Sequence, residues 1–503
     1  QVLKDEDWSD VFLISHHAHF DHLILSHHFS VVPRMSGCTL SMARLLLGNH
    51  ISVSLDSVRK QFGLPEKHTP YNLFRGKHWN ELTPDIQQQV ADGACDEVES
   101  IWTLFNILAK DFPREEFEIV DSVVKMFTEP VLGADIPLLG KVWQDEYVRK
   151  QKLLTDLGVT EADLQSADRF AELLRTEGVE PEMKMGKVST KTGNQKEGYA
   201  FAKTDNFMRD LLEDENERVR TLAEARLGVK ATHMQTRAET LGWMARRGSL
   251  PVYLRYAGAG TLRVSGGDGD NWLNFKRGSA IRKAILAPEG YLLGAVDSSQ
   301  IECRVLHYLA GGPDEPVIQK FRNNEDPYVD LATKFYGEQI YKPKEGDPRY
   351  DEMTAKRGLG KQGRLMLGYG GAGPKFKETA KNGTYGPSVD IPLEDANKFV
   401  ALYRSDTTSV CAPNTGYWAQ CNRMLARLAG GDPIQWGPLY VKDHRIYLPN
   451  GCPLIYDTLE FHIPNDAEKL RLREFEWKGF WRLKTRQGWK TMWGSKLTQN
   501  ICE

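Results

Sequence analysis

Residues 294–312, GAVDSSQIECRVLHYLAGG, decide the fold. The preceding apolar run, residues 291–296, predicts a buried strand that ends directly before Asp297. A carboxylate at the end of a buried strand usually holds a ligand, because a buried charge needs a partner. One aspartate rarely holds a catalytic metal ion alone, so we expect a second carboxylate elsewhere in the chain.

The composition indicates a soluble protein of several domains. A chain of 503 residues is longer than one hydrophobic core usually supports, and 41% hydrophobic with 26% charged residues is ordinary for globular domains. No apolar run is long enough to cross a membrane, and the polar start QVLKDEDWSD is unlike a signal peptide. Because the first residue is Gln, we expect the chain to begin inside a longer reading frame. The seven cysteines include no C-x-x-C pair, which favours a reducing, cytoplasmic location.

Basic residues are concentrated in one segment although the net charge of the chain is −3. Residues 226–283 contain 11 Lys and Arg against 3 acidic residues, interleaved with Tyr253, Tyr256 and Trp272. This mixture suits a nucleic-acid backbone. A solvated basic surface would have the same composition, so the segment alone leaves both interpretations open.

The coarse pattern predicts an α/β unit followed by helical and mixed segments. Residues 11–110 alternate short apolar runs with helical stretches, residues 137–180 have helical spacing, and residues 301–430 are mainly helical. A polar, Gly- and Lys-rich stretch at 185–198 predicts an exposed loop. The sequence RIYLPNGCPLIYD, at 445–457, predicts two strands joined through Pro-Asn-Gly.

The segment KRGLGKQGRLMLGYGG predicts a helix with a chemically distinct face. Arg357, Lys361, Leu365 and Tyr369 follow one another at intervals of four residues, so they share one side of the helix. Two cations, an apolar side chain and an aromatic ring could hold a triphosphate and a base. An ordinary amphipathic helix with a basic rim has the same spacing, and only the neighbouring Asp297 motif favours the first interpretation.

Together these motifs resemble the family A DNA polymerases, the group of bacterial DNA polymerase I and phage replicases. The family's first palm motif is D-Y-S-Q-I-E-x-R, and Ser298 stands where Tyr is common. The matching residues are Asp297, Ser299, Gln300, Ile301, Glu302 and Arg304. The fingers motif R-x3-K-x7-Y-G is matched by Arg357, Lys361, Tyr369 and Gly370. The resemblance covers about residues 110–503.

The resemblance implies a role for each of these residues. Asp297 would bind two Mg²⁺ ions, with the Ser298 carbonyl as a further oxygen ligand. Arg357 and Lys361 would bind the β- and γ-phosphates of a dNTP. Glu302 would exclude a ribose 2′-hydroxyl and bond to Tyr369. The remaining residues of the implied nucleotide pocket are Ser299, Gln300, Ile301, Leu365 and Gly370.

Further stretches resemble the family's primer–template contacts. TLRVSGGDGDNWLN is similar to T-G-R-x-S-G…N-L-Q-N, with Leu262 and Leu273 as departures, and WGSKLTQNIC is similar to the phage helix G-G-K-L-x-E-N. The implied DNA-binding residues are Arg263, Asn271, Asn274, Arg282, Lys230 and Asn500.

Leu365 departs from the family, which usually has Phe or Tyr at this position. Leucine removes a flat ring from beside the incoming sugar and base, so we expect weak acceptance of dideoxynucleotides. Met366 also replaces the family's Gly.

The stretch ISHHAHFDHLILSHH holds six of the 13 histidines, within residues 16–28. No Cys/His set with zinc spacing follows it, which argues against a zinc centre. Instead it resembles the second motif of the DEDD 3′–5′ exonucleases, H-N-x-x-F-D, through His16, Phe20 and Asp21.

A later stretch, DGACDEVESIWTLF, resembles the third exonuclease motif, Y-x3-D. Asp96 is its carboxylate, and it would share metal ions with Asp21; Asp92 stands where the family has Tyr. The first motif, D-x-E, has no counterpart in residues 1–20. We therefore expect an incomplete or degenerate exonuclease, for which a purely structural role stays open.

The second palm carboxylate is also missing, because His-Asp-Glu occurs nowhere in the chain. Two explanations are open: the chain is a fragment of a longer polymerase, or a second polypeptide supplies the rest of the palm. Two other classes also stay open, namely a catalytically inactive DNA-binding relative and a single-subunit RNA polymerase. The Gln-Ile-Glu sequence and the exonuclease-like stretch argue against the RNA polymerase.

The resemblance implies an α/β and α+β multidomain protein, with an incomplete RNase H-like 3′–5′ exonuclease domain before a right-hand polymerase. Its activity would be template-directed DNA synthesis for replication, with primer–template DNA and dNTPs as partners. The predicted segments are an exonuclease-like domain at 1–112, thumb and connecting helices at 113–235, the first part of the palm at 236–306, fingers at 307–440 and an incomplete palm return at 441–503.

Overall fold

The computed structural model divides the chain into two compact units. The first comprises residues 1–128, 254–266 and 295–503, and the second comprises residues 129–253 and 267–294. The described residues are 2–48, 50–66, 71–186, 196–203, 205–230, 233–267, 271–276, 278–466, 479–486 and 488–503. The side chains of residues 2, 4, 71, 206, 230 and 233 lie outside the described set. The finer division into five segments stays a prediction.

The N-terminal part of the first unit contains a β-α-β arrangement. Strands β1 (Phe12–Ser15) and β2 (Met35–Cys38) pair in parallel, with Phe12 opposite Met35, and α2 (Ala18–Phe29) connects them. This confirms the α/β unit predicted near residue 11. The other elements of this part are α1 (Val2–Asp5), η1 (Trp8–Asp10), α3 (Thr39–Leu47), α4 (Leu55–Gln61), α5 (Tyr71–Phe74), η2 (Trp79–Glu81), α6 (Pro84–Leu108) and α7 (Glu116–Thr128).

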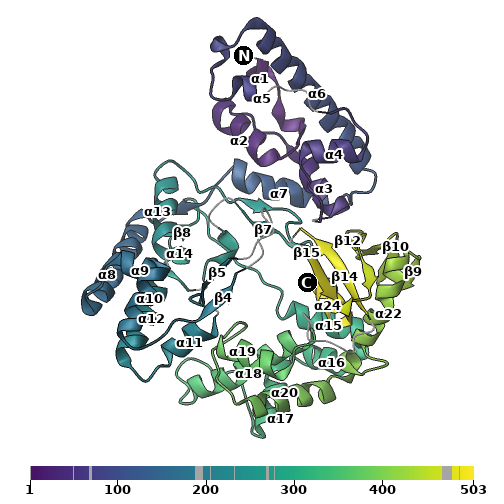
Figure 1. The fold of residues 1–503 in the computed structure, drawn as a ribbon. Coiled ribbons are helices and arrows are strands. Elements are labelled where there is room, and N and C mark those ends of the chain that lie inside the picture. Colours follow the sequence, from purple (N-terminus) through teal and green to yellow (C-terminus); the bar gives the residue numbers. More distant parts are fainter. Residues whose placement is uncertain are drawn as a thin grey trace. The chain divides into compact units, whose positions relative to one another are not determined.

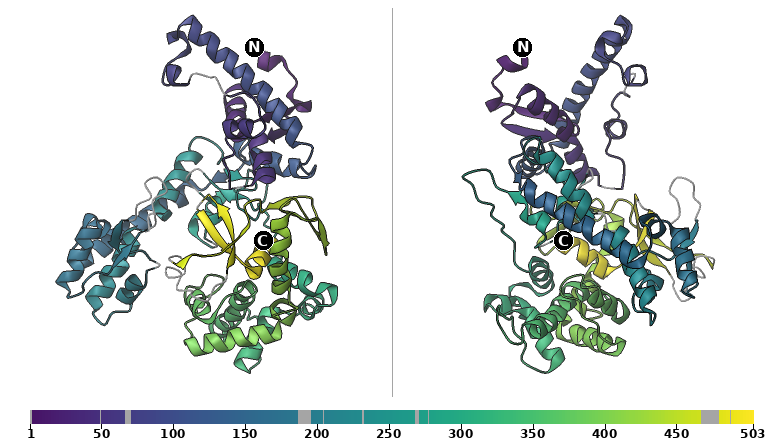
Figure 2. Two further views of the ribbon diagram at one scale, coloured as in Figure 1. Left: turned by 45° about the vertical axis from the view of Figure 1, so that its right-hand side comes forward. Right: turned by 90° about the vertical axis from the view of Figure 1, so that its left-hand side faces the viewer.

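Helices dominate the middle of the first unit, as the sequence predicted for residues 301–430. They are α15 (Ile301–Gly311), η4 (Gly312–Asp314), α16 (Pro316–Arg322), α17 (Pro327–Tyr336), α18 (Tyr350–Leu367), α19 (Gly373–Lys381), α20 (Leu393–Asp406), α21 (Thr408–Cys411) and α22 (Tyr417–Gly430). In Figures 1 and 2, α17 to α20 form one bundle. Its core includes Leu331, Leu359, Phe376, Phe399 and Tyr403.

Glycines let α18 approach its neighbours closely. A Cβ atom on Gly360 would lie 2.1 Å from the Tyr328 carbonyl oxygen of α17, and one on Gly363 would lie 2.3 Å from the Phe399 ring of α20. Glycine costs a helix roughly 1 kcal/mol relative to alanine. Here that cost is offset by close packing, which fixes the helix that carries Arg357 and Lys361.

Two antiparallel sheets complete the first unit. Strands β9 (Ile434–Trp436), β10 (Leu439–Lys442), β11 (Arg445–Tyr447) and β12 (Pro453–Ile455) are neighbours in sequence order, and the pairing of Tyr447 with Pro453 confirms the predicted hairpin. The second sheet is formed by β13 (Glu460–His462), β14 (Phe480–Thr485) and β15 (Gly488–Met492), and α24 (Gly494–Cys502) follows it. A short pair, β6 (Leu254–Arg255) with β7 (Ser265–Gly266), also belongs here.

The second unit is largely helical. Its two hydrophobic clusters include Leu164, Phe170 and Leu222 in one and Leu139, Leu241 and Ile281 in the other. Short strands pair β3 (Gly133–Ala134) with β8 (Ile285–Leu286) and β4 (Met183–Met185) with β5 (Glu197–Tyr199). The helices are α8 (Ile136–Leu157), α9 (Glu161–Gln165), α10 (Ala167–Thr176), α11 (Asn206–Leu212), α12 (Glu217–Lys230), α13 (His233–Ala245), η3 (Trp272–Asn274) and α14 (Ala280–Lys283). Most of the predicted loop at 185–198, residues 187–195, lies outside the described residues.

The predicted buried strand at 291–296 is wrong. The segment is irregular, and its apolar side chains are exposed, with Leu292 at 97% and Val296 at 102%. A strand needs a neighbour for its backbone hydrogen bonds, and none of the described residues pairs with this segment. Asp297 therefore follows an exposed, extended stretch and lies outside any sheet.

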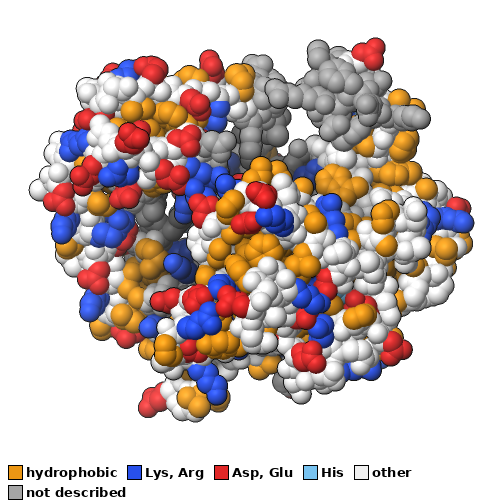
Figure 3. Space-filling view, turned by 90° about the horizontal axis from the view of Figure 1, so that it is seen from below, with side chains coloured by type: hydrophobic (Ala, Val, Ile, Leu, Met, Phe, Trp, Pro, Cys, Tyr) orange, Lys and Arg blue, Asp and Glu red, His pale blue; other side chains and the backbone are white. Residues whose placement is uncertain are grey.

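The surface mixes charges of both signs. On the face in Figure 3, Lys and Arg side chains are interspersed with Asp and Glu, and apolar side chains lie between them. Across the part of the chain that the structure describes, no helix combines the length and the apolar character needed to cross a membrane.

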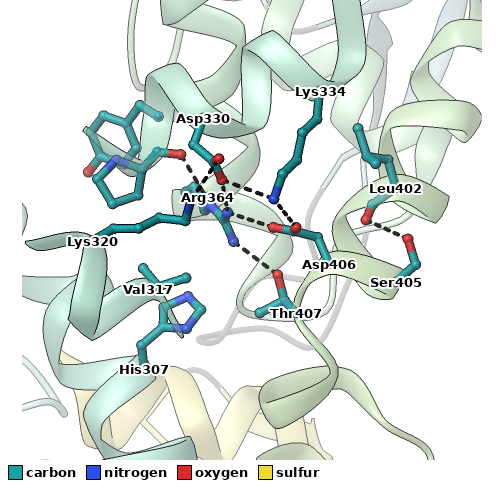
Figure 4. A network of polar contacts seen from close by, with 12 residues as sticks. His307, Val317, Lys320, Asp330, Lys334, Arg364, Leu402, Ser405, Asp406 and Thr407 are labelled. Carbon is teal, nitrogen blue, oxygen red and sulfur yellow. Dashed lines mark hydrogen bonds and ion pairs between the residues drawn. The ribbon is translucent and has the colours of Figure 1, made fainter. Parts of the chain in front are cut away.

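A buried ion-pair network joins the helices around α18 (Figure 4). The Arg364 side chain is fully buried, and its Nη2 lies 2.8 Å from Asp406 Oδ2 while its Nη1 donates to Thr407 Oγ1 at 3.0 Å. Lys334 pairs with both Asp330 and Asp406. Burial raises the pKa of Asp406, but the Lys334 hydrogen bond and the Arg364 charge outweigh this, so its pKa lies below the usual range.

Removing the Arg364 charge should destabilise the helical bundle. In Arg364→Met the carboxylate of Asp406 loses one cationic partner and keeps Lys334, so the cost should lie below the about 3–5 kcal/mol of a fully uncompensated buried charge, at about 2 kcal/mol. Urea unfolding of the full chain should show this loss. As a matched control, Lys398→Ala removes an exposed pair with Glu394 and should cost less than about 1 kcal/mol. Equal stability of Arg364→Met and the parent chain would contradict the role of the network.

Candidate functional site

Asp297 lies on an exposed connection that leads into α15. Asp297, Ser298 and Ser299 are all exposed, and Gln300 caps α15 with a left-handed backbone at φ 56°. Within the described residues the Asp297 carboxylate makes no ion pair and no hydrogen bond. It is therefore available to an external ligand.

Asp326 joins the Asp297 stretch to the predicted phosphate-binding helix. Its Oδ2 accepts hydrogen bonds from Arg357 Nε at 2.8 Å and from Arg357 Nη2 at 2.6 Å. Its Oδ1 accepts from the Tyr328 amide at 3.0 Å, which caps α17, and lies 3.4 Å from Gln300 Nε2. The Arg357 guanidinium also lies 5.6 Å from the centre of the Tyr328 ring. Gln300 and Arg357 are thus both in contact with Asp326.

Sequence reasoning did not single out Asp326 as a site residue. A signal was present in the sequence DPYVDLATKFYG, because Asp before Pro at the start of a helix is a typical N-cap. A capping role alone would not have revealed that the second oxygen of the carboxylate holds Arg357.

Glu302 pairs with Arg263. Arg263 Nη2 lies 2.7 Å from Glu302 Oε1, and Arg263 Nε donates to the Glu503 carbonyl at 3.2 Å. This joins the TLR stretch to the first palm motif. Glu302 was predicted to bond Tyr369, and in the structure its hydrogen bond goes to Arg263. Burial raises the pKa of Tyr369, and the nearby Cys502 and Glu302 add to the rise.

The turn after α18 packs against α24 and α22. Gly370 has φ 95°, and a Cβ atom there would lie 2.3 Å from Ser495 Oγ. Trp418 Nε1 donates to the Gly368 carbonyl at 2.8 Å. Lys361 and Leu365 lie half-buried on α18, one and two turns after Arg357. The turn is therefore held from two sides.

The predicted DNA-binding residues divide between the two units. Arg263 and Asn500 belong to the first, where Asn500 Nδ2 donates to the Tyr456 hydroxyl at 3.1 Å. Asn271, Asn274 and Arg282 belong to the second, where Asn271 Oδ1 caps η3. The side chain of Lys230 lies outside the described residues. A common DNA surface for this set stays a prediction.

In the N-terminal part of the first unit, Asp21 lies in the first turn of α2. Desolvation raises the pKa of Asp21, the Glu97 charge adds to the rise, and His17 and Ser15 oppose it. The carboxylate of α6 that contributes to the raised pKa of Asp21 is that of Glu97. The adjacent Asp96 is exposed. Phe20 is exposed as well. Whether Asp21 and Asp96 share a metal ion stays a prediction.

Several histidines of this part are held inside the fold. His16 Nδ1 lies 3.0 Å from Thr39 Oγ1 and its Nε2 lies 3.0 Å from the Val53 carbonyl. His22 lies between the hydroxyls of Ser15 and Ser36, at 3.1 and 3.0 Å. Over the described ranges, no group of three or more His, Cys, Asp or Glu side chains is arranged to hold a metal ion.

Comparison with known proteins gives partial but consistent matches. No protein-family model matches the chain. DNA polymerase I of Thermus aquaticus is 38% identical over 126 residues, 25% of this chain and 13% of that protein. DNA polymerase I of Pseudomonas aeruginosa is 33% identical over 118 residues, 23% of this chain and 12% of that protein. The matches thus span only a small part of the length of these relatives.

A solved structure extends the similarity to most of the fold. The polymerase domain of Pol1 from M. smegmatis, in complex with DNA primer-template and dNTP, has a TM-score of 0.55 and 18% identity; the match covers 83% of this chain and 66% of that chain. The fold is therefore that of a polymerase domain of the DNA polymerase I class. The local sequence matches, which cover about a quarter of the chain, are to DNA polymerase I as well.

The buried histidines make the N-terminal part of the first unit sensitive to acid. Burial lowers the pKa of His19 and of His22 to about 4, whereas an unfolded histidine titrates near 6.5. The stability they contribute is complete above pH 6.5 and is lost as the pH falls toward 4, because only the unfolded state takes up their protons. His22→Gln should reduce the slope of unfolding free energy by about 1.4 kcal/mol per pH unit in this window.

Urea unfolding between pH 7.5 and 4 measures this slope. His78 is exposed, so His78→Gln should leave the slope unchanged. A slope that stays the same in His22→Gln would show that His22 does not titrate on unfolding.

Proposed function

We propose that the chain forms most of a template-directed DNA polymerase, which adds dNTPs to a primer 3′-hydroxyl. The observation that carries the proposal is the Arg357–Asp326–Gln300 contact, which brings the fingers helix α18 to the stretch that begins at Asp297. In the reaction the primer oxygen bonds to the α-phosphorus, the bond to the β-phosphate breaks, and pyrophosphate leaves. The similarity to DNA polymerase I in sequence and in fold supports the same activity.

Arg357 and Lys361 are suited to the triphosphate. Arg357 presents two N–H groups to one carboxylate oxygen of Asp326, and the same donors match a phosphate oxygen. Asp326 would hold this side chain in place before the nucleotide arrives. Tyr328 limits its movement from the other side. Arg357 is thus oriented before binding, which lowers the entropy cost of binding.

Glu302 is suited to select the sugar. Its ion pair with Arg263 fixes the carboxylate beside the start of α15, where it would occupy the space of a ribose 2′-hydroxyl. Arg263 would also hold the Glu302 carboxylate away from the phosphates. Tyr369, half-buried in the turn after α18, would close the pocket behind it.

The Asp297 carboxylate and the Ser298 carbonyl would hold Mg²⁺, which supplies charge neutralisation and activation of the primer hydroxyl. The fit is partial. Asp297 is exposed and has no ion-pair partner among the described residues, but a site for two ions needs another carboxylate.

We further propose that this carboxylate comes with a strand that pairs with residues 291–297. The exposure of Leu292 and Val296 supports this, because apolar side chains on an unpaired, extended segment are suited to become one strand of a sheet. The partner strand would be supplied either by a continuation of the same chain or by a second polypeptide.

Primer extension tests the proposed activity. The chain mixed with a palm segment containing a His-Asp-Glu hairpin should extend a primer in Mg²⁺, and Asp297→Asn should abolish extension because one metal ligand is lost. Asp314→Asn alters an exposed aspartate outside the described contacts and should leave extension unchanged.

Three results would overturn parts of this proposal. Extension by the chain alone would refute the need for the missing carboxylate. Binding of primer–template without extension would favour a catalytically inactive relative. Equal use of NTPs and dNTPs would favour an RNA polymerase and would contradict the role of Glu302.

The side chain at 365 should set the response to dideoxynucleotides. Leu365 offers no ring to the incoming sugar, so the completed enzyme should prefer dNTPs over ddNTPs. Leu365→Phe should shift this ratio toward equality by roughly fivefold, the size of one aromatic contact of about 1 kcal/mol. Competitive incorporation of ddTTP and dTTP measures the ratio, with Leu365→Met as a control of similar volume. Equal incorporation by the parent enzyme would refute the expectation.

A 3′–5′ exonuclease is a weaker candidate. The charge of Glu97 adds to the raised pKa of Asp21. Asp92 occupies the position where the exonuclease family has Tyr. We propose that residues 1–128 mainly support the polymerase part of the first unit. Their contact with it includes the Arg486 guanidinium, which donates to the Ile51 carbonyl at 3.1 Å.

A further inference from the structure

An apolar stripe runs along helix α6, which lies at an outer edge of the N-terminal part of the first unit (Figures 1 and 2). Its members follow one another at alternating intervals of four and three residues and are Ala91, Cys95, Val98, Trp102 and Phe105. This alternation places side chains on one side of a helix and is typical of a seam that packs against another helix. None of the residues proposed for the polymerase reaction lies on α6.

Most of the stripe is exposed to solvent. Val98 is 66% and Trp102 is 59% exposed, and Ala91 and Cys95 are exposed as well. The residues of α6 that pack into the fold lie on another side of the helix and are Gly93, Ser100, Leu104 and Leu108. Single exposed apolar side chains are ordinary in a globular protein, but a contiguous row of them indicates an interaction surface.

The stripe is anchored to the fold at its C-terminal end. The Trp102 ring is stacked on the Phe105 ring, with the ring centroids 5.9 Å apart. The Phe105 ring meets the Phe12 ring of β1 edge-on at 5.8 Å and lies 6.0 Å from the Phe117 ring of α7. Trp102 thus rests on a ring that the fold holds in place, and it offers a partner an ordered aromatic surface.

The side of α6 next to the stripe carries negative charge. Because successive residues lie about 100° apart around a helix, four carboxylates share this side, namely those of Asp85, Asp92, Asp96 and Glu99. All four residues are exposed, and within the described residues none of them forms an ion pair. The helix itself contains no Lys or Arg. The surface therefore combines an apolar row with an uncompensated acidic flank.

We infer that this face of α6 binds an amphipathic helix of a partner protein, which has apolar residues at heptad spacing and Lys or Arg beside them. The apolar residues of the partner would lie on Val98 and Trp102, and its cations would face Asp92 and Glu99. Opposite charges beside an apolar seam determine which helices pair. The inference goes beyond the proposed function and does not depend on it.

The acidic flank argues against other occupants. A nucleic acid or an anionic membrane would place its phosphates beside four carboxylates, and like charges repel. A second copy of this chain is disfavoured for the same reason, because an antiparallel pair of α6 helices would bring the two acidic flanks together. A basic helix has neither problem.

Fluorescence anisotropy of a labelled 21-residue peptide with the full chain tests this surface. The peptide has three repeats of Leu-Lys-Ala-Leu-Ala-Lys-Lys, and a second peptide has Glu in place of Lys. The lysine peptide should bind and the glutamate peptide should not. Val98→Asn should weaken binding about tenfold, the loss expected for one buried valine side chain. Asp92→Asn with Glu99→Gln should weaken it about fivefold and reduce its sensitivity to salt, because two ion pairs are lost.

Matched controls make the same changes on helices of the second unit. Val148→Asn alters a valine of α8 that is 53% exposed, and Asp210→Asn with Glu224→Gln neutralises two exposed acidic residues. These variants should bind the lysine peptide like the parent chain. Thermal melting of all variants should match the parent chain, so that a loss of binding reports the surface and not the fold.

Three outcomes would overturn the inference. The glutamate peptide could bind as tightly as the lysine peptide, which would show that the acidic flank does not select the partner. The α6 variants could bind like their controls. Light scattering could show a dimer of the chain that Val98→Asn dissociates, which would mean that a second copy covers the stripe. None of these measurements involves primer extension, so a failure of the proposed polymerase activity would leave them unaffected.

Discussion

The carboxylate of Asp326 is the contact on which the candidate site depends. One oxygen holds the Arg357 guanidinium through two hydrogen bonds, and the other caps α17 and lies near Gln300. Three segments of sequence thus meet at one side chain. Because α18 is also fixed by its glycines and by the buried Arg364 network, the position of Arg357 is determined by the packing of the whole helical bundle.

The same constraint explains the composition of α18. The proposed binding of a triphosphate needs cations on one face of the helix, whereas close packing against α17 and α20 needs small residues on another. The sequence RGLGKQGR meets both needs, since Gly360 and Gly363 face the neighbouring helices. Arg364 is the exception, a buried cation in the packed region, and it is neutralised by Asp406 and Asp330. Buried charge is tolerated there because each charge has a partner.

Local patterns in the sequence predicted local structure well and contacts between segments poorly. The β-α-β unit and the Tyr447–Pro453 hairpin follow from period and turn chemistry. The strand expected at 291–296 does not form in the described residues. A strand needs a neighbouring strand for its backbone hydrogen bonds, and the sequence of the segment does not show whether such a neighbour is present. The role of Asp96, which was chosen by motif alignment, stays a prediction; the next residue, Glu97, lies about 100° further around the helix, and its charge adds to the raised pKa of Asp21.

The distribution of charge shows why a search along the sequence finds only part of a binding surface. Residues 226–283 are the most basic run that the sequence analysis identified, but the fold divides them between the two units. The cations that line the cavity beside residues 44–50 and the β14–β15 hairpin show the converse: they are far apart in the sequence and close together in the fold. Arg44 is separated from Lys484 by more than 400 residues, and the two share a cavity wall only because α3 and the β14–β15 hairpin meet in the fold. An electrostatic field depends on distances in space, so a group of cations of this kind can be recognised only in the folded chain.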